Sequence, residues 1–278
     1  AKKPKRLLPT FCVISFFLSA ILNNILTVII LIPLTITMSR MLNFDPEPYI
    51  LTQAIVVNIG GTLFSISSIP NILIALEADI GFNQYFVNIG IFSLLVFVII
   101  VSLFYLQYKS ELSFDEKNLG ILMEFDPMNF IQSKALFQKS TLTLLSVLIG
   151  FVLIPKEILP GFMISFLGAV LLILICKLDQ DKIIQSIDLE LFLYLMGIFV
   201  IAGAIEAVGI IEILGKVVLR ASGGNIFGTI LIILWFSAIL SATIDNIPIT
   251  KVLIPVVSLI VTDYSPEMAN IVFYSLSI

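Results

Sequence analysis

The chain has 278 residues, of which 59% are hydrophobic and only 12% are charged, and its mean hydropathy is +1.13. Soluble chains carry about 25% charged residues, so this composition excludes an ordinary soluble domain and indicates an all-α, multi-pass membrane protein. The net charge of −4 gives no basic surface for nucleic acid, and a chain without histidine lacks a usual ligand of zinc and haem.

The first predicted element is a helical hairpin in the apolar segment 7–38, with Asn23 and Asn24 near its centre. About 32 positions are too many for one membrane span and too few for two, because each span needs about 20 residues. The segment therefore predicts a re-entrant hairpin whose two half-length arms meet near the membrane midplane. Irregular backbone at that depth is tolerated only beside protein or a wet cavity.

The middle of the chain predicts a discontinuous helix, a full span and a loop. Residues 49–76 are apolar but are interrupted by Asn58-Ile59-Gly60-Gly61-Thr62 and by a Ser-rich stretch, which predicts a broken helix. Residues 86–106 predict an ordinary span. Residues 107–140 form the only long polar stretch and predict a surface loop with room for one amphipathic helix.

The remaining apolar segments are 141–154, 161–175 and 191–219, and a second hairpin then follows at residues 226–261. Its predicted tip is Asp245-Asn246-Ile247-Pro248, where Pro248 removes a helix donor. The two cysteines, Cys12 and Cys176, lie far apart in apolar segments. They are interpreted as small core hydrophobes rather than as a disulfide or a metal site.

Both predicted tips belong to one duplicated passage. Residues 19–33 and 241–255 align without a gap at a constant offset of 222, and seven of their fifteen positions are identical. Polar groups in the middle of an apolar run are costly and need a reason. Finding them twice at a fixed spacing predicts two structural repeats that form one site.

The distribution of basic residues predicts the direction in which each hairpin enters the membrane. If the first enters from the cytoplasm and later spans alternate, eleven basic residues are cytoplasmic and three lie on the far side, which agrees with the positive-inside rule. The eleven are Lys2, Lys3, Lys5, Arg6, Arg40, Lys109, Lys117, Lys134, Lys139, Lys177 and Lys182, and the three are Lys156, Lys216 and Arg220. The second hairpin then enters from the opposite face, so the repeats are predicted to be inverted.

The offset also predicts three parts in the chain. Residues 1–108 are the C-terminal part of the first repeat, 109–140 are a cytoplasmic linker loop, and 141–278 are the second repeat. The first repeat should start about 80 residues before residue 1, and a second helix break should lie near position 280. We therefore expect an excerpt of a longer polypeptide, truncated before its second broken helix.

The leading candidates for a substrate or ion site are Asn23, Asn24, Asp245 and Asn246. Amide oxygens and freed carbonyls can replace the hydration shell of a cation, whereas amide hydrogens and helix N-termini can bind an anion or a neutral oxyacid. The alternative is that each asparagine only hydrogen-bonds a neighbouring helix. Duplication at a fixed offset favours the site.

A second polar cluster lies in the predicted helix break and comprises Asn58, Gly60, Gly61, Thr62 and Asn71. Glycine lets the backbone turn its carbonyls outward and approach a substrate closely. The alternative is that the glycines only allow tight helix packing. The density of hydroxyl side chains around them favours binding.

Three charged residues are predicted within the membrane: Glu206, Asp245 and Lys251. The two copies of the passage differ at Asp245, whose counterpart Asn23 cannot titrate. A carboxylate at this depth can exchange a proton during transport, and Lys251, six residues later, could pair with it. A static ion pair that holds the hairpin together is the alternative, and both remain open. Glu206 either lines the pathway or marks a helix end near water.

At these residues the chain resembles the arsenical-pump membrane protein and the P-protein permeases of the ion transporter superfamily. The matching passages are residues 18–24 with Pro33, 58–62 followed by Pro70-Asn71, 199–209 and 240–248. The resemblance implies substrate binding between two hairpin tips and two unwound helices, movement of that unit against a scaffold, and a homodimer.

Departures from the family pattern bear on the substrate. The P-protein branch usually has Asp-Asn at the first tip, where this chain has Asn23-Asn24, and Gly-Asp-Pro where this chain has Ser67-Ser68-Ile69. Lys251 also replaces what is commonly a small residue. Fewer carboxylates and an extra lysine favour proton coupling or facilitated anion passage over a sodium site.

The sequence thus predicts a secondary transporter of the plasma membrane and not an enzyme, with no cofactor and no metal site. The expected substrate is a small inorganic anion or a metalloid oxyacid such as arsenite, exported in exchange for protons by an elevator-type movement. The alternatives are a sodium/proton antiporter or carboxylate transporter on the same scaffold, and a non-transporting membrane subunit of a larger assembly.

Overall fold

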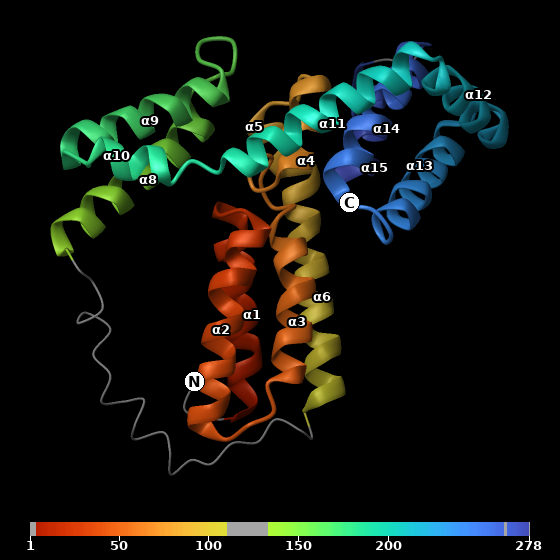
Figure 1. Cartoon of the computed structure of the whole chain (residues 1–278). Coiled ribbons are helices and arrows are strands. Elements are labelled where there is room, and N and C mark those ends of the chain that lie inside the picture. Colours follow the sequence, from red (N-terminus) through yellow and green to blue (C-terminus); the bar gives the residue numbers. More distant parts are fainter. Residues whose placement is uncertain (1–3, 110–132, 264–265, 278) are drawn as a thin grey trace.

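The computed structural model describes residues 4–109, 133–263 and 266–277 (Figure 1). Every regular element within these ranges is a helix, as the composition predicts. The predicted linker lies largely in residues 110–132, outside the described ranges, and so does the amphipathic helix expected there. The helix that follows begins at Lys134, seven residues before the predicted start of the second repeat.

The first hairpin consists of α1 (Pro4–Ile21) and α2 (Asn24–Leu42), joined at Asn23. The prediction of half-length arms is wrong here, because α1 and α2 contain 18 and 19 residues. Both helices continue beyond the apolar segment into its polar flanks. At a rise of 1.5 Å per residue each arm is about 27 Å long, and α2 alone is long and apolar enough to cross a membrane.

The discontinuous helix is confirmed. Helix α3 (Glu47–Gly60) ends at the predicted break, and α4 (Ile69–Glu77) resumes after residues 61–68. Gly60 lies against the backbone of α1, because a β-carbon there would be 2.4 Å from the carbonyl oxygen of Phe16. For Gly60 this contact favours the packing interpretation, since only glycine permits this close approach of α1 and α3.

The predicted span at 86–106 is longer and less regular than expected. Helix α5 (Phe82–Tyr85), the π-helical turn η1 (Phe86–Gly90) and α6 (Ile91–Tyr108) form one continuous stretch of 27 residues. Gly90 lies directly against the helix break, because a β-carbon there would be 2.4 Å from the carbonyl oxygen of Leu63. Single π-turns inside α-helices are frequent at functional sites.

Helices α8 (Lys134–Leu153), α9 (Gly161–Cys176) and α10 (Gln180–Gln185) form a separate group at the upper left of Figure 1. Their loop is fixed to the α4–α5 corner by an ion pair between Lys156 and Asp79, 2.7 Å long. Asn83 also donates to the carbonyl oxygen of Val152 at 2.8 Å. This polar contact joins the group to the first half of the chain.

The last third of the chain contains α11 (Leu189–Ala207), α12 (Ile210–Ser222), the hairpin α13 (Ile226–Ser241) and α14 (Asn246–Ile260), the 3-10 turn η4 (Val261–Asp263) and α15 (Pro266–Ser277). The predicted single segment 191–219 is two helices, because Gly209 adopts a left-handed conformation with φ of 77° and ends the first. Helix α14 packs against α4, α11, α12, α13 and α15.

Two hydrophobic cores are connected by the broken helix. One core gathers buried residues of α1, α3 and α6, including Phe16, Tyr49 and Val56. The other gathers residues of the C-terminal helices together with Ile74 of α4 and Tyr85 of α5. Thus α3 belongs to one core and α4 to the other, so the break between them lies at the junction of the two halves.

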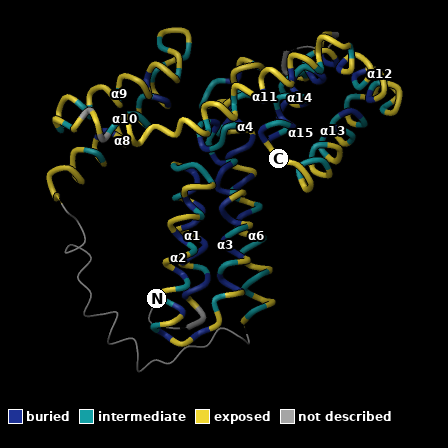
Figure 2. The backbone as a smooth tube through the Cα atoms, in the orientation of Figure 1, coloured by how far each residue is buried: buried dark blue, intermediate teal, exposed yellow. Residues whose placement is uncertain are grey.

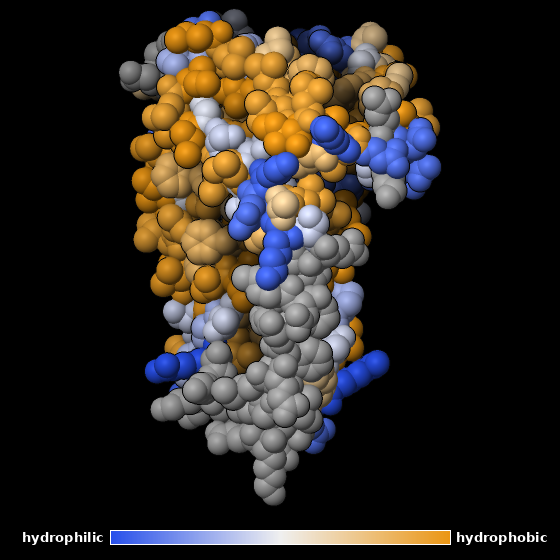
Figure 3. Space-filling view, turned by 90° about the vertical axis from the view of Figure 1, so that its left-hand side faces the viewer, coloured by the Kyte–Doolittle hydropathy of each residue, from blue (hydrophilic) through white to orange (hydrophobic). Residues whose placement is uncertain are grey.

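Much of the molecular surface is apolar, as a protein in a lipid bilayer requires. Four of the described helices are long and apolar enough to cross a membrane, namely α2, the α5–α6 stretch, α8 and α11. Figure 2 shows exposed residues along almost the whole of α9 and α11, and Figure 3 shows that hydrophobic residues predominate in the described part of one face. Trp235 is among the exposed hydrophobic residues.

Candidate functional site

The first hairpin tip is tied to α3 by a small polar network. Ser19 Oγ lies 2.6 Å from the carbonyl oxygen of Val57 and 2.8 Å from Asn24 Oδ1, so its single proton can be donated to either acceptor. The Asn24 amide nitrogen donates to Asn58 Oδ1 at 3.3 Å. Asn58 in turn donates to the carbonyl oxygen of Ala54 at 3.1 Å. The tip and the end of α3 therefore share one hydrogen-bond chain.

Gly61 is the point where the first turns of two helices meet. A β-carbon on Gly61 would lie 2.4 Å from Asn24 Oδ1, and Asn24 is the first residue of α2. From the other side, buried Asn71 in the first turn of α4 donates to the Gly61 carbonyl oxygen at 2.9 Å. Helix N-termini carry partial positive charge and unpaired N–H groups, so two of them at one place favour an anion or an oxyacid.

The remaining predicted residues of this cluster have local roles. Asn23 caps α2, because its Oδ1 accepts from the backbone nitrogen of Ile25 at 3.0 Å. Thr62 donates to the carbonyl oxygen of Ile59 at 2.8 Å, which leaves its oxygen able to accept. Of the predicted set, the structure brings Asn24, Asn58, Gly61 and Asn71 together, whereas Gly60 faces α1.

The second tip repeats the geometry of the first. Ser241 Oγ donates to Asn246 Oδ1 at 3.4 Å, which is the counterpart, 222 residues later, of the contact between Ser19 and Asn24. Asp245 has φ and ψ of −56° and 143°, and Asn23 has −60° and 144°. Each second arm also contains a proline, at positions 33 and 255. At the two tips, the duplication in the sequence is therefore accompanied by a similar local structure.

The ionisable groups of the second hairpin contact α11 and not each other. Asp245 Oδ2 accepts a hydrogen bond from the hydroxyl of Tyr194 at 2.7 Å. Lys251 Nζ lies 4.9 Å from the centre of the Phe199 ring. Within the described residues the ion pair that forms is between Lys156 and Asp79, so the expected pair of Asp245 with Lys251 is not present.

The two tips are not in contact. Figure 1 shows them on opposite sides of the column formed by α3, α4 and α6, with the first tip pointing upward and the second downward in that view. Among the described residues, no hydrogen bond joins Asp245 or Asn246 to the first tip. Glu206 is exposed near the end of α11, and both interpretations of this residue stay open.

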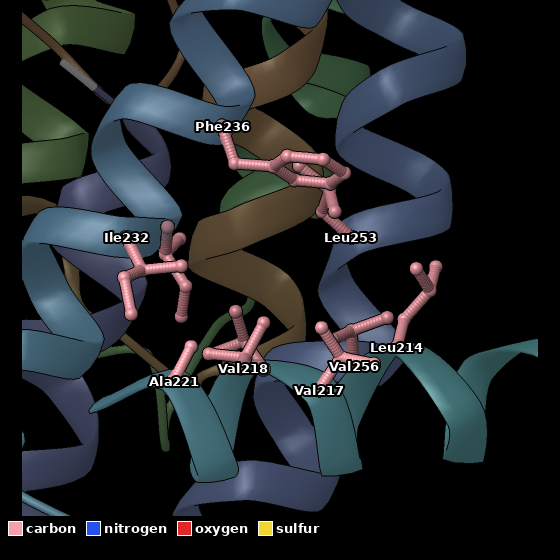
Figure 4. A pocket seen from close by; sticks show the side chains of 10 residues that line it. Leu214, Val217, Val218, Ala221, Ile232, Phe236, Leu253 and Val256 are labelled. Atoms are coloured by element: carbon pink, nitrogen blue, oxygen red, sulfur yellow. The ribbon is translucent and has the colours of Figure 1, made fainter. Parts of the chain in front are cut away.

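A small cavity of about 100 Å³ lies between α12, α13 and α14 (Figure 4). Aliphatic side chains and one phenylalanine line it, so it offers no partner to a polar substrate. Its lining residues are Leu214, Val217, Val218, Ala221, Ile232, Ile233, Phe236, Leu253, Val256 and Val257. In the described part of the chain, no cluster of three or more metal-ligating side chains forms either.

The sequence interpretation missed four residues that complete the two tips. Ser19 and Ser241 stand at equivalent positions of the duplicated passage, so their shared role was readable from the alignment of the two copies. Tyr194 and Phe199 have no counterpart within the chain at the offset of 222. Phe199 begins the passage 199–209 that carries the family resemblance, but no pattern in the sequence singled out its side chain or that of Tyr194.

Comparison with known proteins places the chain in a family. A profile of the CitMHS family, described as citrate transporter, matches residues 1–277. The chain belongs to this family. Among curated proteins it is 26% identical over 99% of its length to a 46 kDa membrane protein of Mycobacterium leprae, of which it covers 64%. It is also 26% identical, over 92% of its length, to an uncharacterized transporter of Mycobacterium tuberculosis, of which it covers 59%.

The resemblance to the P-protein branch is also confirmed. The human P protein is 23% identical over 92% of this chain, which covers 40% of that protein. The chain thus spans less than two thirds of the length of these relatives. Together with the apolar helices, the family membership shows a multi-pass integral membrane protein.

Proposed function

We propose that the chain forms the transport core of a secondary membrane transporter for a small anion or oxyacid. The observation that carries this proposal is the meeting of the α2 and α4 N-termini at Gly61, beside the amides of Asn24 and Asn58. Half-helix N-termini at a broken helix are the arrangement by which transporters hold anionic substrate groups. The membership of the citrate transporter family agrees with it.

The proposal includes inverted repeats and an elevator-type movement. The two tips share their backbone angles and their Ser–Asn hydrogen bond, and they point in opposite directions in Figure 1. Two such hairpins entering from opposite faces would present one site alternately to the two sides. A homodimer, which the resemblance implies, belongs to the same proposal.

Two substrate classes fit the first tip. A metalloid oxyacid such as arsenite can both donate to and accept from amide groups, and it needs no cationic partner. A carboxylate such as citrate is favoured by the name of the family, and its negative charge would be stabilised at the helix N-termini by about 0.3–1 kcal/mol each. Both classes use the same amides and the same helix ends.

Proton coupling is assigned in this proposal to Asp245 and Lys251. The structure keeps the carboxylate and the ammonium on separate contacts with α11. Each is therefore free to change its charge without leaving an opposite charge unpaired. We expect Asp245→Asn and Lys251→Ala each to alter the dependence of transport on an imposed pH gradient, and unchanged dependence in both variants would refute the coupling.

The decisive experiment is flux through the full-length protein in proteoliposomes, with arsenite, citrate and sodium tested separately. Asn24→Ala and Asn58→Ala should lower flux about tenfold or more, because each removes amide groups from the site. Gly203→Ala on α11 is the control, since a β-carbon there meets nothing within 4 Å. Sodium-dependent flux alone would favour the antiporter alternative, and no flux with any substrate would favour a non-transporting subunit.

A further inference from the structure

The backbone of Asp245 has the conformation of a helix cap, but its carboxylate does not cap α14. Its φ and ψ match those of Asn23, which caps α2 through the backbone nitrogen of Ile25. Aspartate is as good a helix cap as asparagine. Yet the Asp245 side chain makes no capping hydrogen bond to α14 and instead accepts from the hydroxyl of Tyr194 at 2.7 Å.

A second contact joins the same two helices. Lys251, in the second turn of α14, lies over the ring of Phe199, five residues after Tyr194 on α11. A cation over an aromatic face contributes about 0.5–1 kcal/mol at an exposed site. Helix α11 therefore contacts both ionisable groups of the second hairpin and holds them apart.

No other charged group competes for Asp245 in the described part of the chain. Helix α14 packs against α4, α11, α12, α13 and α15. The charged residues on these elements whose side chains are described are Glu77, Glu190, Glu206, Glu212, Lys216 and Arg220. Of these, Glu77 accepts from Ser258 at 3.4 Å, and none forms an ion pair with Asp245. Tyr194 is thus the partner that fixes the direction of the carboxylate.

We propose that Tyr194 is a positioning residue that latches the second hairpin tip to α11. While the phenol donates to Asp245, the carboxylate points toward α11, and it becomes free to meet a substrate or a coupling ion when that bond breaks. The role of the released tip in transport rests on the proposed function. The hydrogen bond between Tyr194 and Asp245 can itself be tested without measuring transport.

The size of the effect follows from the nature of the bond. A hydrogen bond to a charged group is stronger than one between neutral groups, but Tyr194 and Asp245 are both exposed, which weakens it. We expect removal of the hydroxyl to raise the population of the released tip about fivefold.

The test is the distance between a spin label on α11 and one on the tip, in the full-length protein in lipid. Labels are placed at Gly197→Cys, where an added β-carbon meets nothing within 4 Å, and at Ile244→Cys, where the native side chain is 52% exposed. The native thiols Cys12 and Cys176 are replaced by alanine. Tyr105→Phe on α6 is the matched control, because it removes a tyrosine hydroxyl from a different helix.

The latch predicts that Tyr194→Phe and Asp245→Ala each increase the fraction of a longer distance about fivefold, and that the double variant increases it no further. Equal distributions in Tyr194→Phe and the parent, or additive effects in the double variant, would overturn it. A tip released by Tyr194→Phe in a protein without flux would sustain the latch and refute the transporter. Normal flux together with unchanged label distances in Tyr194→Phe would support the transporter and refute the latch.

Discussion

The substitution Gly61→Ala tests whether the first tip depends on the close approach of Asn24 to the helix break. Gly61 has φ and ψ of −63° and −12°, which any residue can adopt, so alanine brings no backbone strain. Its β-carbon would nevertheless lie 2.4 Å from Asn24 Oδ1 and 2.8 Å from Nδ2. The asparagine side chain must therefore move away from both Ser19 and Asn58.

The expected magnitude comes from the two hydrogen bonds that this movement breaks. Each is worth about 0.5–1.5 kcal/mol in general and about 0.6 kcal/mol on average between membrane helices. Their loss costs about 1–3 kcal/mol in total. Replacing glycine by alanine at a compatible position returns about 0.4–1 kcal/mol through the unfolded state. The net destabilisation should be about 1–2 kcal/mol, which corresponds to a fall in Tm of about 2–8 °C for a chain of this size.

The assay is thermal unfolding of the purified protein in detergent, combined with a double-mutant cycle. Because the steric conflict acts through the Asn24 side chain, Gly61→Ala should cost little further stability in an Asn24→Ala background. Gly203→Ala, where a β-carbon meets nothing within 4 Å, should leave Tm within about 1 °C of the parent. If Gly61→Ala lowers Tm as much with Asn24→Ala as without it, the reasoning is refuted.

Three further outcomes follow from the contacts. Gly60→Ala should destabilise the protein by about 2 kcal/mol or more, which is more than Gly61→Ala, because its β-carbon meets the carbonyl oxygen of Phe16 and only backbone movement can relieve this contact. An unchanged Tm would show that α1 and α3 can separate freely. Asn71→Leu should cost about 1–3 kcal/mol by leaving a carbonyl in the helix break without its buried donor, and Asn71→Asp, which lacks the N–H, should not restore it. Lys156→Met should loosen the α8–α9 loop from Asp79 and raise the rate of amide hydrogen exchange in that loop and in the α4–α5 corner, with little change in Tm. Exchange equal to that of the parent would mean that the apolar contacts alone hold the loop.

The sequence predicted those features that depend on a local break in an apolar pattern. The two hairpin tips and the interrupted helix all lie where polar or glycine residues interrupt a hydrophobic run, and the structure confirms each of them. The predicted lengths of the first hairpin's arms and of the span at 86–106 were wrong. Helices α1 and α2 continue into polar flanks because polar residues can extend a helix, whereas hydropathy records only the apolar part.

Two irregularities of the backbone were not readable in advance. The π-turn at Phe86–Gly90 lies within an apolar run, so the pattern of the sequence gave no reason to expect anything but regular helix. The end of α11 at Gly209 was overlooked because a single glycine in an apolar segment is equally compatible with helix packing. The left-handed conformation of Gly209 decides the second case, and a tertiary contact accompanies the first. Gly90 accommodates the carbonyl of Leu63, which belongs to another element.

The expected ion pair of Asp245 with Lys251 failed for a reason of geometry. Asp245 precedes α14 with a non-helical backbone, φ −56° and ψ 143°, whereas Lys251 lies more than one turn inside that helix. The carboxylate and the ammonium therefore reach different positions along α11, where a phenol and an aromatic ring receive them. A separation of three or four residues would have been needed for pairing on one face.

The same geometry explains why two nearly identical tips can have different tasks. Asn23 uses its side-chain oxygen to cap its own helix, and Asn24 links the tip to α3. At the second tip Asn246 retains the contact with the preceding serine, but Asp245 leaves its helix uncapped and reaches outward to α11. An uncapped N-terminus keeps unpaired N–H groups that a ligand can use. The first tip is thus held by the amide of Asn24 on α3, whereas the second is held by a carboxylate on the hydroxyl of Tyr194. In the proposed coupling step, only the second tip has a side chain that can exchange its hydrogen bond for a proton.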